Sequence, residues 1–252
     1  MAKIALITGA TAGIGEACAH TFAREGYNLI LTGRRMDRLE RLADKLNEEY
    51  NVKVAVSSFD VRSREQVVSN LDTLPADWKQ IDVLVNNAGL SQGLDPVQSG
   101  SYEDWDTMID TNVKGLLYVT RVVSNWMIDN GTGHIINIGS IAGKEVYPNG
   151  NVYCATKHAV DALTKAMRID MLKHGIRVTA VHPGAVETEF SEVRFKGDKE
   201  RAKKVYDGFE PLVAQDIAET VWFAASRPAH VNINELTVMP TAQATATNIF
   251  KK

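Results

Sequence analysis

The sequence is poor in cysteine and in long apolar runs. Only two of the 252 residues are cysteines, Cys18 and Cys154, and we expect both to be small buried residues rather than a disulfide or a metal pair. No apolar run approaches the ~20 residues of a membrane-spanning helix. The first run, residues 4–7, is also too short for a signal peptide. We therefore expect a cytoplasmic protein.

Blocks of like charge are also absent. The chain has 28 Lys and Arg against 31 Asp and Glu, a net charge of −3. This balance gives no reason to expect a nucleic acid or a membrane surface as partner. The histidines His134, His158 and His182 have no metal-ligand spacing, so we expect no metal and assign them structural roles.

Short apolar runs alternate with longer amphipathic stretches. The runs predict strands at residues 3–7, 28–32, 52–59, 81–85, 134–138, 176–181 and 233–239. The stretches predict a first helix that ends near Arg24 and helices at residues 36–50, 64–74, 105–130, 152–174 and 214–226. This alternation predicts a single α/β domain, residues 1–252, with a doubly wound sheet. A charged segment at about 187–210 is expected to be mobile.

The turn after the first predicted strand contains Gly9, Gly13 and Gly15. Glycine lets backbone N–H groups approach a pyrophosphate, and the following helix directs its positive N-terminal end at the same anion. Position after the first strand of an α/β pattern favours dinucleotide binding. The alternative is an ordinary tight turn between a strand and a helix.

The second predicted strand ends in Thr32-Gly33-Arg34-Arg35, without the carboxylate that binds the ribose 2′-hydroxyl of NAD. Two guanidiniums at this place could bind a 2′-phosphate, so the sequence favours NADP over NAD. The alternative is a solvated basic start of a helix, where the helix dipole disfavours positive charge.

The third and fourth predicted strands also end in residues that could face a cofactor. Asp60 and Val61 follow the third strand; Asp60 either lies near an adenine or caps the next helix, and both roles can coexist. Asn87, Ala88 and Gly89 follow the fourth strand, at the edge where ligands bind in open α/β sheets. Their small size permits a ribose to come close.

The stretch from Ser140 to Lys157 contains residue types suited to proton transfer. If the chain is helical from Val152 onward, Tyr153 and Lys157 lie four residues apart on one helix face. An ammonium beside a phenol favours the phenolate, so we expect the pKa of Tyr153 to fall below about 10. Such a tyrosine could exchange a proton with a substrate oxygen near neutral pH.

Five motifs in one order make the chain resemble the short-chain dehydrogenase/reductase family along its whole length. They are T-G-x-x-x-G-x-G from Thr8, N-N-A-G from Asn86, Ser140, Y-x-x-x-K from Tyr153, and Pro183-Gly184. The resemblance implies a Rossmann-type fold with seven parallel strands. It also implies an enzyme that acts on CH–OH groups.

The resemblance further implies a catalytic set of Asn112, Ser140, Tyr153 and Lys157. Tyr153 would be the general acid/base, and Ser140 would bind the substrate oxygen. Lys157 would lower the tyrosine pKa and hold the nicotinamide ribose. Asn112 would distort the long helix and hold a water that links Lys157 to solvent.

Together, these arguments give an expected NADP-binding set. It comprises Gly9, Thr11, Gly13, Ile14, Gly15, Arg34, Arg35, Asp60, Val61, Asn87, Ala88, Gly89, Tyr153, Lys157, Pro183, Gly184, Val186 and Thr188. Ala12 departs from the family pattern, because NADP-preferring members often carry Arg or Lys there. Phosphate recognition would then depend on Arg34 and Arg35.

Longer stretches, such as M-I-D-T-N-V-K-G-L-L-Y and H-V-N-I-N-E, are similar to NADP-dependent 3-hydroxy acid dehydrogenases. That subgroup oxidises serine, L-allo-threonine and related acids, reduces malonic semialdehyde-type compounds, and is typically a homotetramer. The alternatives are a broad carbonyl or sugar-alcohol reductase of the same family and a non-catalytic dinucleotide sensor.

A hydroxy acid needs a cation for its carboxylate. We hypothesise that Arg194, in the loop after the sixth predicted strand, supplies it. The alternative is a solvated arginine paired with Glu189 or Glu192.

Overall fold

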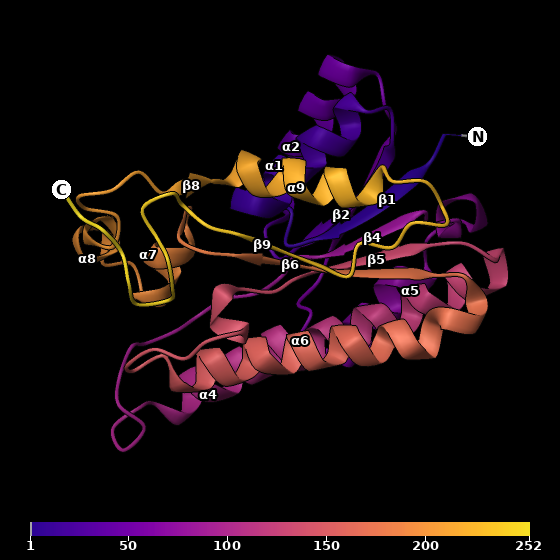
Figure 1. Ribbon diagram of the computed structural model, residues 1–252. Coiled ribbons are helices and arrows are strands. Elements are labelled where there is room, and N and C mark those ends of the chain that lie inside the picture. Colours follow the sequence, from indigo (N-terminus) through magenta and orange to yellow (C-terminus); the bar gives the residue numbers. More distant parts are fainter. Residues whose placement is uncertain (1) are drawn as a thin grey trace.

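Seven parallel strands form one sheet in the computed structural model, which describes residues 2–252. Their spatial order is β3 (Val54–Ser58), β2 (Asn28–Gly33), β1 (Ile4–Thr8), β4 (Val83–Asn86), β5 (His134–Ile138), β6 (Arg177–Pro183) and β9 (Glu235–Val238) (Figure 1). The order changes direction between β1 and β4, where open α/β sheets bind ligands beyond the carboxyl ends of their strands. The predicted fold class is confirmed.

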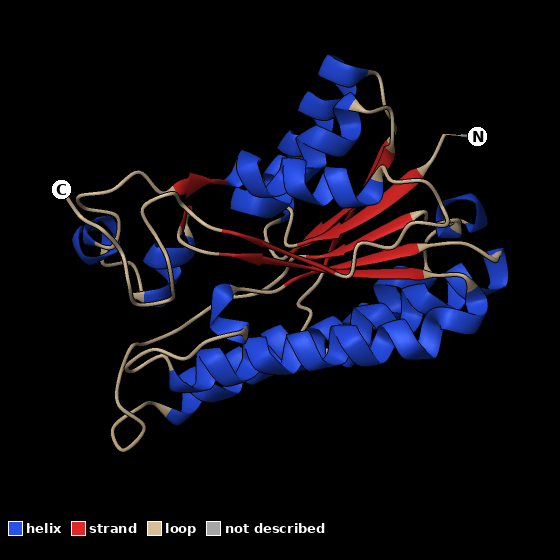
Figure 2. Cartoon of the chain, viewed as in Figure 1, coloured by secondary structure: helices blue, strands red, loops and turns tan. Residues whose placement is uncertain are grey.

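Helices cover both faces of the sheet (Figure 2). One face carries α1 (Gly13–Arg24), α2 (Met36–Tyr50) and α9 (Ala214–Ala225); the other carries α3 (Arg64–Asp72), α5 (Leu116–Asn130) and α6 (Asn151–Met171). Each face of the sheet has its own hydrophobic core. In β1, the side chains of Ala5 and Ile7 pack in the core under α1, α2 and α9, and Leu6 packs in the core under α3, α5 and α6. Because both faces are buried, the strands are apolar throughout rather than alternating. No helix in residues 2–252 is long and apolar enough to span a membrane.

The long helix predicted over residues 105–130 is continuous but begins earlier and contains a wide turn. α4 (Tyr102–Ile109), the π-helical η2 (Asp110–Gly115) and α5 follow one another directly. The helix begins at Tyr102 because the Ser101 side chain accepts a hydrogen bond from the backbone N–H of Asp104. The irregularity expected at Asn112 is this π turn.

Several predicted ends differ by one to three residues from the observed ones. β3 is shorter than residues 52–59, and α3 ends at Asp72 rather than at 74. α6 ends at Met171, and a 3-10 turn (Leu172–His174) leads to Gly175. Such differences arise where helices fray and where strand pairing stops, which local residue patterns specify weakly.

The segment at 187–210 contains more structure than the sequence indicated. It holds α7 (Phe190–Arg194) and α8 (Lys199–Lys204). Its ends lie beside each other because β7 (Val186–Glu187) pairs in parallel with β8 (Leu212–Val213). The C-terminus lies against it, where the backbone N–H of Lys252 donates to the carbonyl of Gly208 at 2.8 Å (Figure 1). The mobility of this segment stays a prediction.

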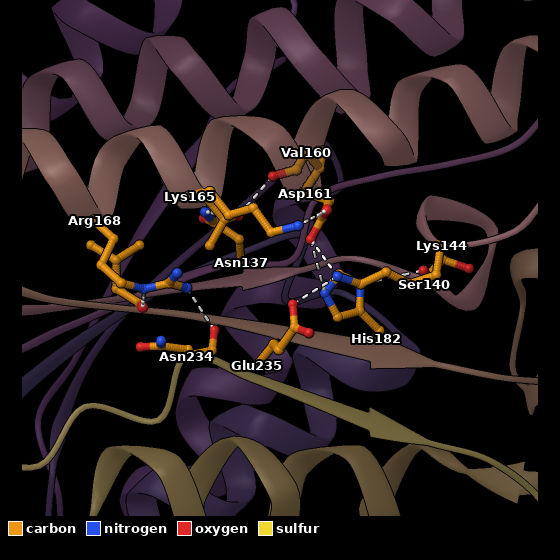
Figure 3. A network of polar contacts seen from close by, with 12 residues as sticks. Asn137, Ser140, Lys144, Val160, Asp161, Lys165, Arg168, His182, Asn234 and Glu235 are labelled. Carbon is orange, nitrogen blue, oxygen red and sulfur yellow. Dashed lines mark hydrogen bonds and ion pairs between the residues drawn. The ribbon is translucent and has the colours of Figure 1, made fainter.

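A polar network joins α6 to the sheet (Figure 3). Asp161 of α6 accepts from the ammonium groups of Lys144 and Lys165, each at 2.7 Å. Lys144 also pairs with Glu235 of β9 at 2.7 Å. Burial raises the pKa of Asp161, but hydrogen bonds and charge from the two lysines lower it by a larger amount. The pKa of Asp161 therefore lies below its ordinary value. The network therefore anchors the helix that carries Tyr153 and Lys157.

Replacing Asp161 by Asn is expected to lower the free energy of unfolding at pH 7 by about 2 kcal/mol, because charge-assisted hydrogen bonds to two lysines are lost. A carboxyl whose pKa is lowered by folding stabilises the protein above its ordinary pKa of 3.8. That contribution disappears as the pH falls through the native pKa. Urea unfolding at pH 7 and at about pH 3 should therefore show a smaller difference between the two proteins at acid pH.

Asp37→Asn is the control for this experiment. Asp37 pairs with Arg41 at 2.6 Å, but both side chains are more than two-thirds exposed. Its loss should change stability by less than about 0.5 kcal/mol. A difference between Asp161→Asn and the unaltered protein that stays constant down to pH 3 would contradict the assignment.

Candidate functional site

A cleft of about 590 Å³ opens beyond the carboxyl ends of the central strands. The segments after β1, β2, β3, β4, β5 and β6 all contribute to its lining, together with residues from 187–210. Every predicted site residue lines this cleft except Gly15 and Asn112. The parallel sheet therefore brings together motifs that are dispersed over most of the chain.

The turn between β1 and α1 is packed closely enough to require glycine at position 15. A Cβ there would overlap the carbonyl oxygen of Gly9, so Gly15 serves the approach of α1 rather than the cleft surface. No side chain caps α1 at Ala12, and Gly13 and Ile14 of its first turn line the cleft. Unpaired N–H groups at a helix N-terminus form a site for an anion, which fits a pyrophosphate.

Arg35 is fixed by contacts on two sides. Its Nε and Nη2 donate to Thr11 Oγ1 at 3.1 and 2.8 Å, and its Nη1 donates to Glu189 Oε2 at 3.0 Å. Arg38, which the sequence analysis did not select, donates to Glu189 Oε1 at 2.7 Å. Arg35 is therefore held in place although its side chain is 40% exposed, and Arg34 is exposed in the cleft lining. The assignment of both arginines to a 2′-phosphate stays a prediction.

Asp60 lines the cleft, but its helix-capping interpretation is wrong. Ser63 caps α3 by accepting a hydrogen bond from the backbone N–H of Gln66. Asp60 pairs instead with Arg62 at 2.6 Å. Burial raises the Asp60 pKa, but hydrogen bonds and charge from Arg62 lower it below its ordinary value.

α6 places Tyr153 and Lys157 in the wall of the cleft, which Ser140 also lines. The Lys157 side chain is buried, and its ammonium donates to the carbonyl of Ile138 at 2.9 Å. Burial lowers the pKa of Lys157 to about 8, because an ammonium loses hydration in the interior.

Asn112 lies outside the cleft and fixes the chain around it. Its Oδ1 accepts from the N–H of Leu90, and its Nδ2 donates to the carbonyl of Leu90 and to Thr156 Oγ1, at 2.8, 2.8 and 3.0 Å. These bonds tie the π turn to the loop after β4 and to α6. The predicted water at this place stays a prediction.

The expectation that Lys157 lowers the pKa of Tyr153 is wrong for this arrangement. Burial raises that pKa, and the Arg194 guanidinium and a hydrogen bond with Ser140 oppose the rise only in part. The guanidinium carbon of Arg194 lies 5.2 Å from the centroid of the Tyr153 ring. The cation that favours the phenolate is therefore Arg194, which lies far from Tyr153 in the sequence.

Arg194 lies inside the cleft rather than in solvent. Its Nε donates to Ser91 Oγ at 3.1 Å and its Nη2 to the Tyr147 hydroxyl at 2.8 Å. Three aromatic ring centroids lie between 5.2 and 5.8 Å from its guanidinium carbon. Within residues 2–252 it forms no ion pair, so the alternative of pairing with Glu189 or Glu192 is wrong.

A buried histidine contacts the backbone of Ser140. His182, fully buried on β6, has Nδ1 3.3 Å from the carbonyl of Ser140 and Nε2 3.5 Å from Asp161 (Figure 3). A Cβ at position 139 would overlap the His182 ring, so glycine lets this contact form. His182, Asp161 and Glu235 are close enough to bind a cation together, but the Lys144 ammonium already contacts both carboxylates.

Part of the cleft lining comes from residues that no sequence motif indicated. The additional residues include Tyr147, Phe190, Tyr206, Gln243, Ala246 and Ile249. The Gln243 side chain accepts from the backbone N–H of Ala185 at 2.8 Å, which brings the C-terminal segment to the cleft. Residues 241–247 alternate Ala with Thr or Gln and match none of the motifs described above, so no motif identifies them as cleft lining. Tyr147 and Phe190 could have been predicted as lining, because both are aromatic residues close in the sequence to a predicted site residue.

Comparison with known proteins gives one consistent family. The family model described as short chain dehydrogenase matches residues 3–199. The NADP-dependent 3-hydroxy acid dehydrogenase YdfG of Salmonella typhi is 50% identical over 244 residues, which cover 96% of this chain and 97% of that protein. Sulfoacetaldehyde reductase 2 of Chromohalobacter salexigens is 47% identical, covering 97% of this chain and 96% of that protein.

Among solved structures, the closed form of serine dehydrogenase complexed with NADP+ superposes with a TM-score of 0.92. It is 47% identical and covers 99% of this chain and 100% of that one.

Proposed function

The chain belongs to the short-chain dehydrogenase/reductase family, and we propose that it is an NADP-dependent dehydrogenase of 3-hydroxy acids. Serine, L-allo-threonine and 3-hydroxypropionate are the substrates that we expect, with malonic semialdehyde-type compounds in the reductive direction. The observation that carries the substrate class is Arg194, a guanidinium in the cleft beside Tyr153 that pairs with no carboxylate of residues 2–252. A substrate carboxylate supplies the missing partner.

NADP fits the residues that line the cleft, and when bound it exchanges a hydride with the substrate carbon. The uncapped start of α1 is suited to the pyrophosphate, and Arg34 and Arg35 to the 2′-phosphate. We assign the remaining contacts to Asp60, Val61, Asn87, Ala88, Gly89, Lys157 and the stretch from Pro183 to Thr188.

Tyr153 and Ser140 perform the proton chemistry in this proposal. Ser140 binds the substrate oxygen, and the Tyr153 oxygen accepts the hydroxyl proton during oxidation and returns it during reduction. Arg194 favours the phenolate that oxidation requires. Lys157, with a pKa of about 8, can exchange a proton near neutral pH. The same arginine therefore serves both the substrate carboxylate and the general base.

A substrate panel tests the activity. NADPH absorbance is followed with L-serine, L-allo-threonine, 3-hydroxypropionate, sulfoacetaldehyde and a neutral diketone. We expect the hydroxy acids to be turned over with NADP, and Tyr153→Phe to nearly abolish turnover while NADPH affinity stays largely intact. Preference for the neutral diketone would indicate a broad carbonyl reductase. NADPH binding without turnover of any compound would indicate a sensor.

Replacing Arg194 by Met should raise KM for 3-hydroxypropionate by about tenfold or more, because a charge-assisted contact is lost. KM for the neutral diketone should change little. The variant should also shift the pH dependence of kcat for oxidation to higher pH, because removing a nearby cation raises the pKa of Tyr153. Steady-state kinetics between pH 6 and 10 measure both effects.

Arg201→Met is the matched control for this variant. Arg201 stacks on the Phe195 ring at 4.3 Å in the same segment but does not line the cleft. Its loss should leave both KM values and the pH profile unchanged. Equal losses on charged and neutral substrates in Arg194→Met would contradict the assignment.

We also propose that the protein is a homotetramer. Apolar side chains are exposed along the helices of one face, including Leu117 of α5 and Ile169 of α6, which is 75% exposed. Burying such side chains between subunits is favourable. Light scattering on the eluted protein should give four times the chain mass of 27.7 kDa. A mass of one chain would contradict the proposal.

A further inference from the structure

One carboxylate ties the segment that carries Arg194 to the cofactor arginines. Glu189 directly precedes α7, the short helix that ends with Arg194. Its two oxygens accept from Arg38 at 2.7 Å and from Arg35 at 3.0 Å. Hydrogen bonds from both arginines lower the pKa of Glu189, so it is ionised at neutral pH. These two ion pairs thus connect the start of α2 to the segment after β6.

We propose that Glu189 competes with the 2′-phosphate of the cofactor for Arg35 and Arg38. A carboxylate with one oxygen on each of two guanidiniums occupies the donors that a phosphate would use. The inference rests on the proposed function, in which Arg35 binds the 2′-phosphate. It goes beyond it by assigning a role to Glu189 and Arg38.

The geometry of Arg35 makes the two anions alternatives. Its Nε and Nη2 are occupied by Thr11, and the Nη1 that remains for an anion is the one that holds Glu189. Arg38 also uses its Nη1 for Glu189. A phosphate at this place would bring up to two negative charges against the carboxylate, and like charges in contact repel. Binding of the 2′-phosphate is therefore expected to weaken the pairing of Glu189 with Arg35 and Arg38.

This weakening has a consequence at the substrate end of the cleft. Glu189 directly precedes α7 and Arg194 ends it, so a weaker pairing of Glu189 removes one of the contacts that hold the start of α7. NAD lacks the 2′-phosphate and leaves these two ion pairs in place.

The test measures binding of two fragments by titration calorimetry, which needs no turnover. The first is 2′,5′-ADP, which carries the 2′-phosphate, and the second is 5′-ADP, which does not. Glu189→Gln should bind 2′,5′-ADP about three- to tenfold more tightly than the unaltered protein does, as expected for the removal of two half-exposed ion pairs. Its affinity for 5′-ADP should not change.

Glu192→Gln is the matched control, because it removes the same charge from α7 at a carboxylate for which no ion pair occurs within residues 2–252. Its affinity for both fragments should match the unaltered protein. Equal gains in both variants would overturn the inference, as would an unchanged preference for 2′,5′-ADP in Glu189→Gln. If the unaltered protein bound both fragments equally, the assignment of Arg35 to the 2′-phosphate would fail instead.

Discussion

The burial of ionisable groups in the wall of the cleft is the constraint on which the site depends. The interior disfavours both the phenolate of Tyr153 and the ammonium of Lys157, raising the pKa of the first and lowering that of the second to about 8. The surrounding structure opposes this effect. A backbone carbonyl accepts from Lys157, and the Arg194 guanidinium lies over the Tyr153 ring. A cation contributed by a distant segment, rather than the neighbouring lysine, therefore opposes the rise in the Tyr153 pKa, and it does so only in part.

Arginines lie at or beside both ends of the cleft, although the net charge of the chain is −3. Arg35 and Arg38 face a carboxylate of the chain itself, whereas Arg194 contacts only neutral groups and aromatic rings. A guanidinium that faces aromatic rings is partly shielded from water, which strengthens its attraction for an anion. This distribution suits a small acid as substrate better than a neutral ketone.

The sequence predicted the sheet and the helices that flank it, and nearly all of the predicted site residues line the cleft, because motifs at the ends of parallel strands must converge at one edge. It failed where the outcome depended on contacts between distant residues. Glu189 and Arg35 are 154 residues apart in the sequence, and the residues around each give no indication that the two pair. The sign of the Tyr153 pKa shift depended on burial, which spacing along a helix does not reveal. The sequence suggested Asp60 as the cap of the next helix, but α3 begins later and Ser63 caps it.

The short pairing of β7 with β8 has an evolutionary consequence. Val186 pairs with Leu212, so the chain between them begins and ends at the same place in the fold. Insertions or exchanges within this excursion need not disturb the strands that hold the cofactor, since loop closure entropy grows slowly with length. A change of substrate could therefore arise within residues 187–211 alone, without altering the strands and the helix that carry Ser140, Tyr153 and Lys157.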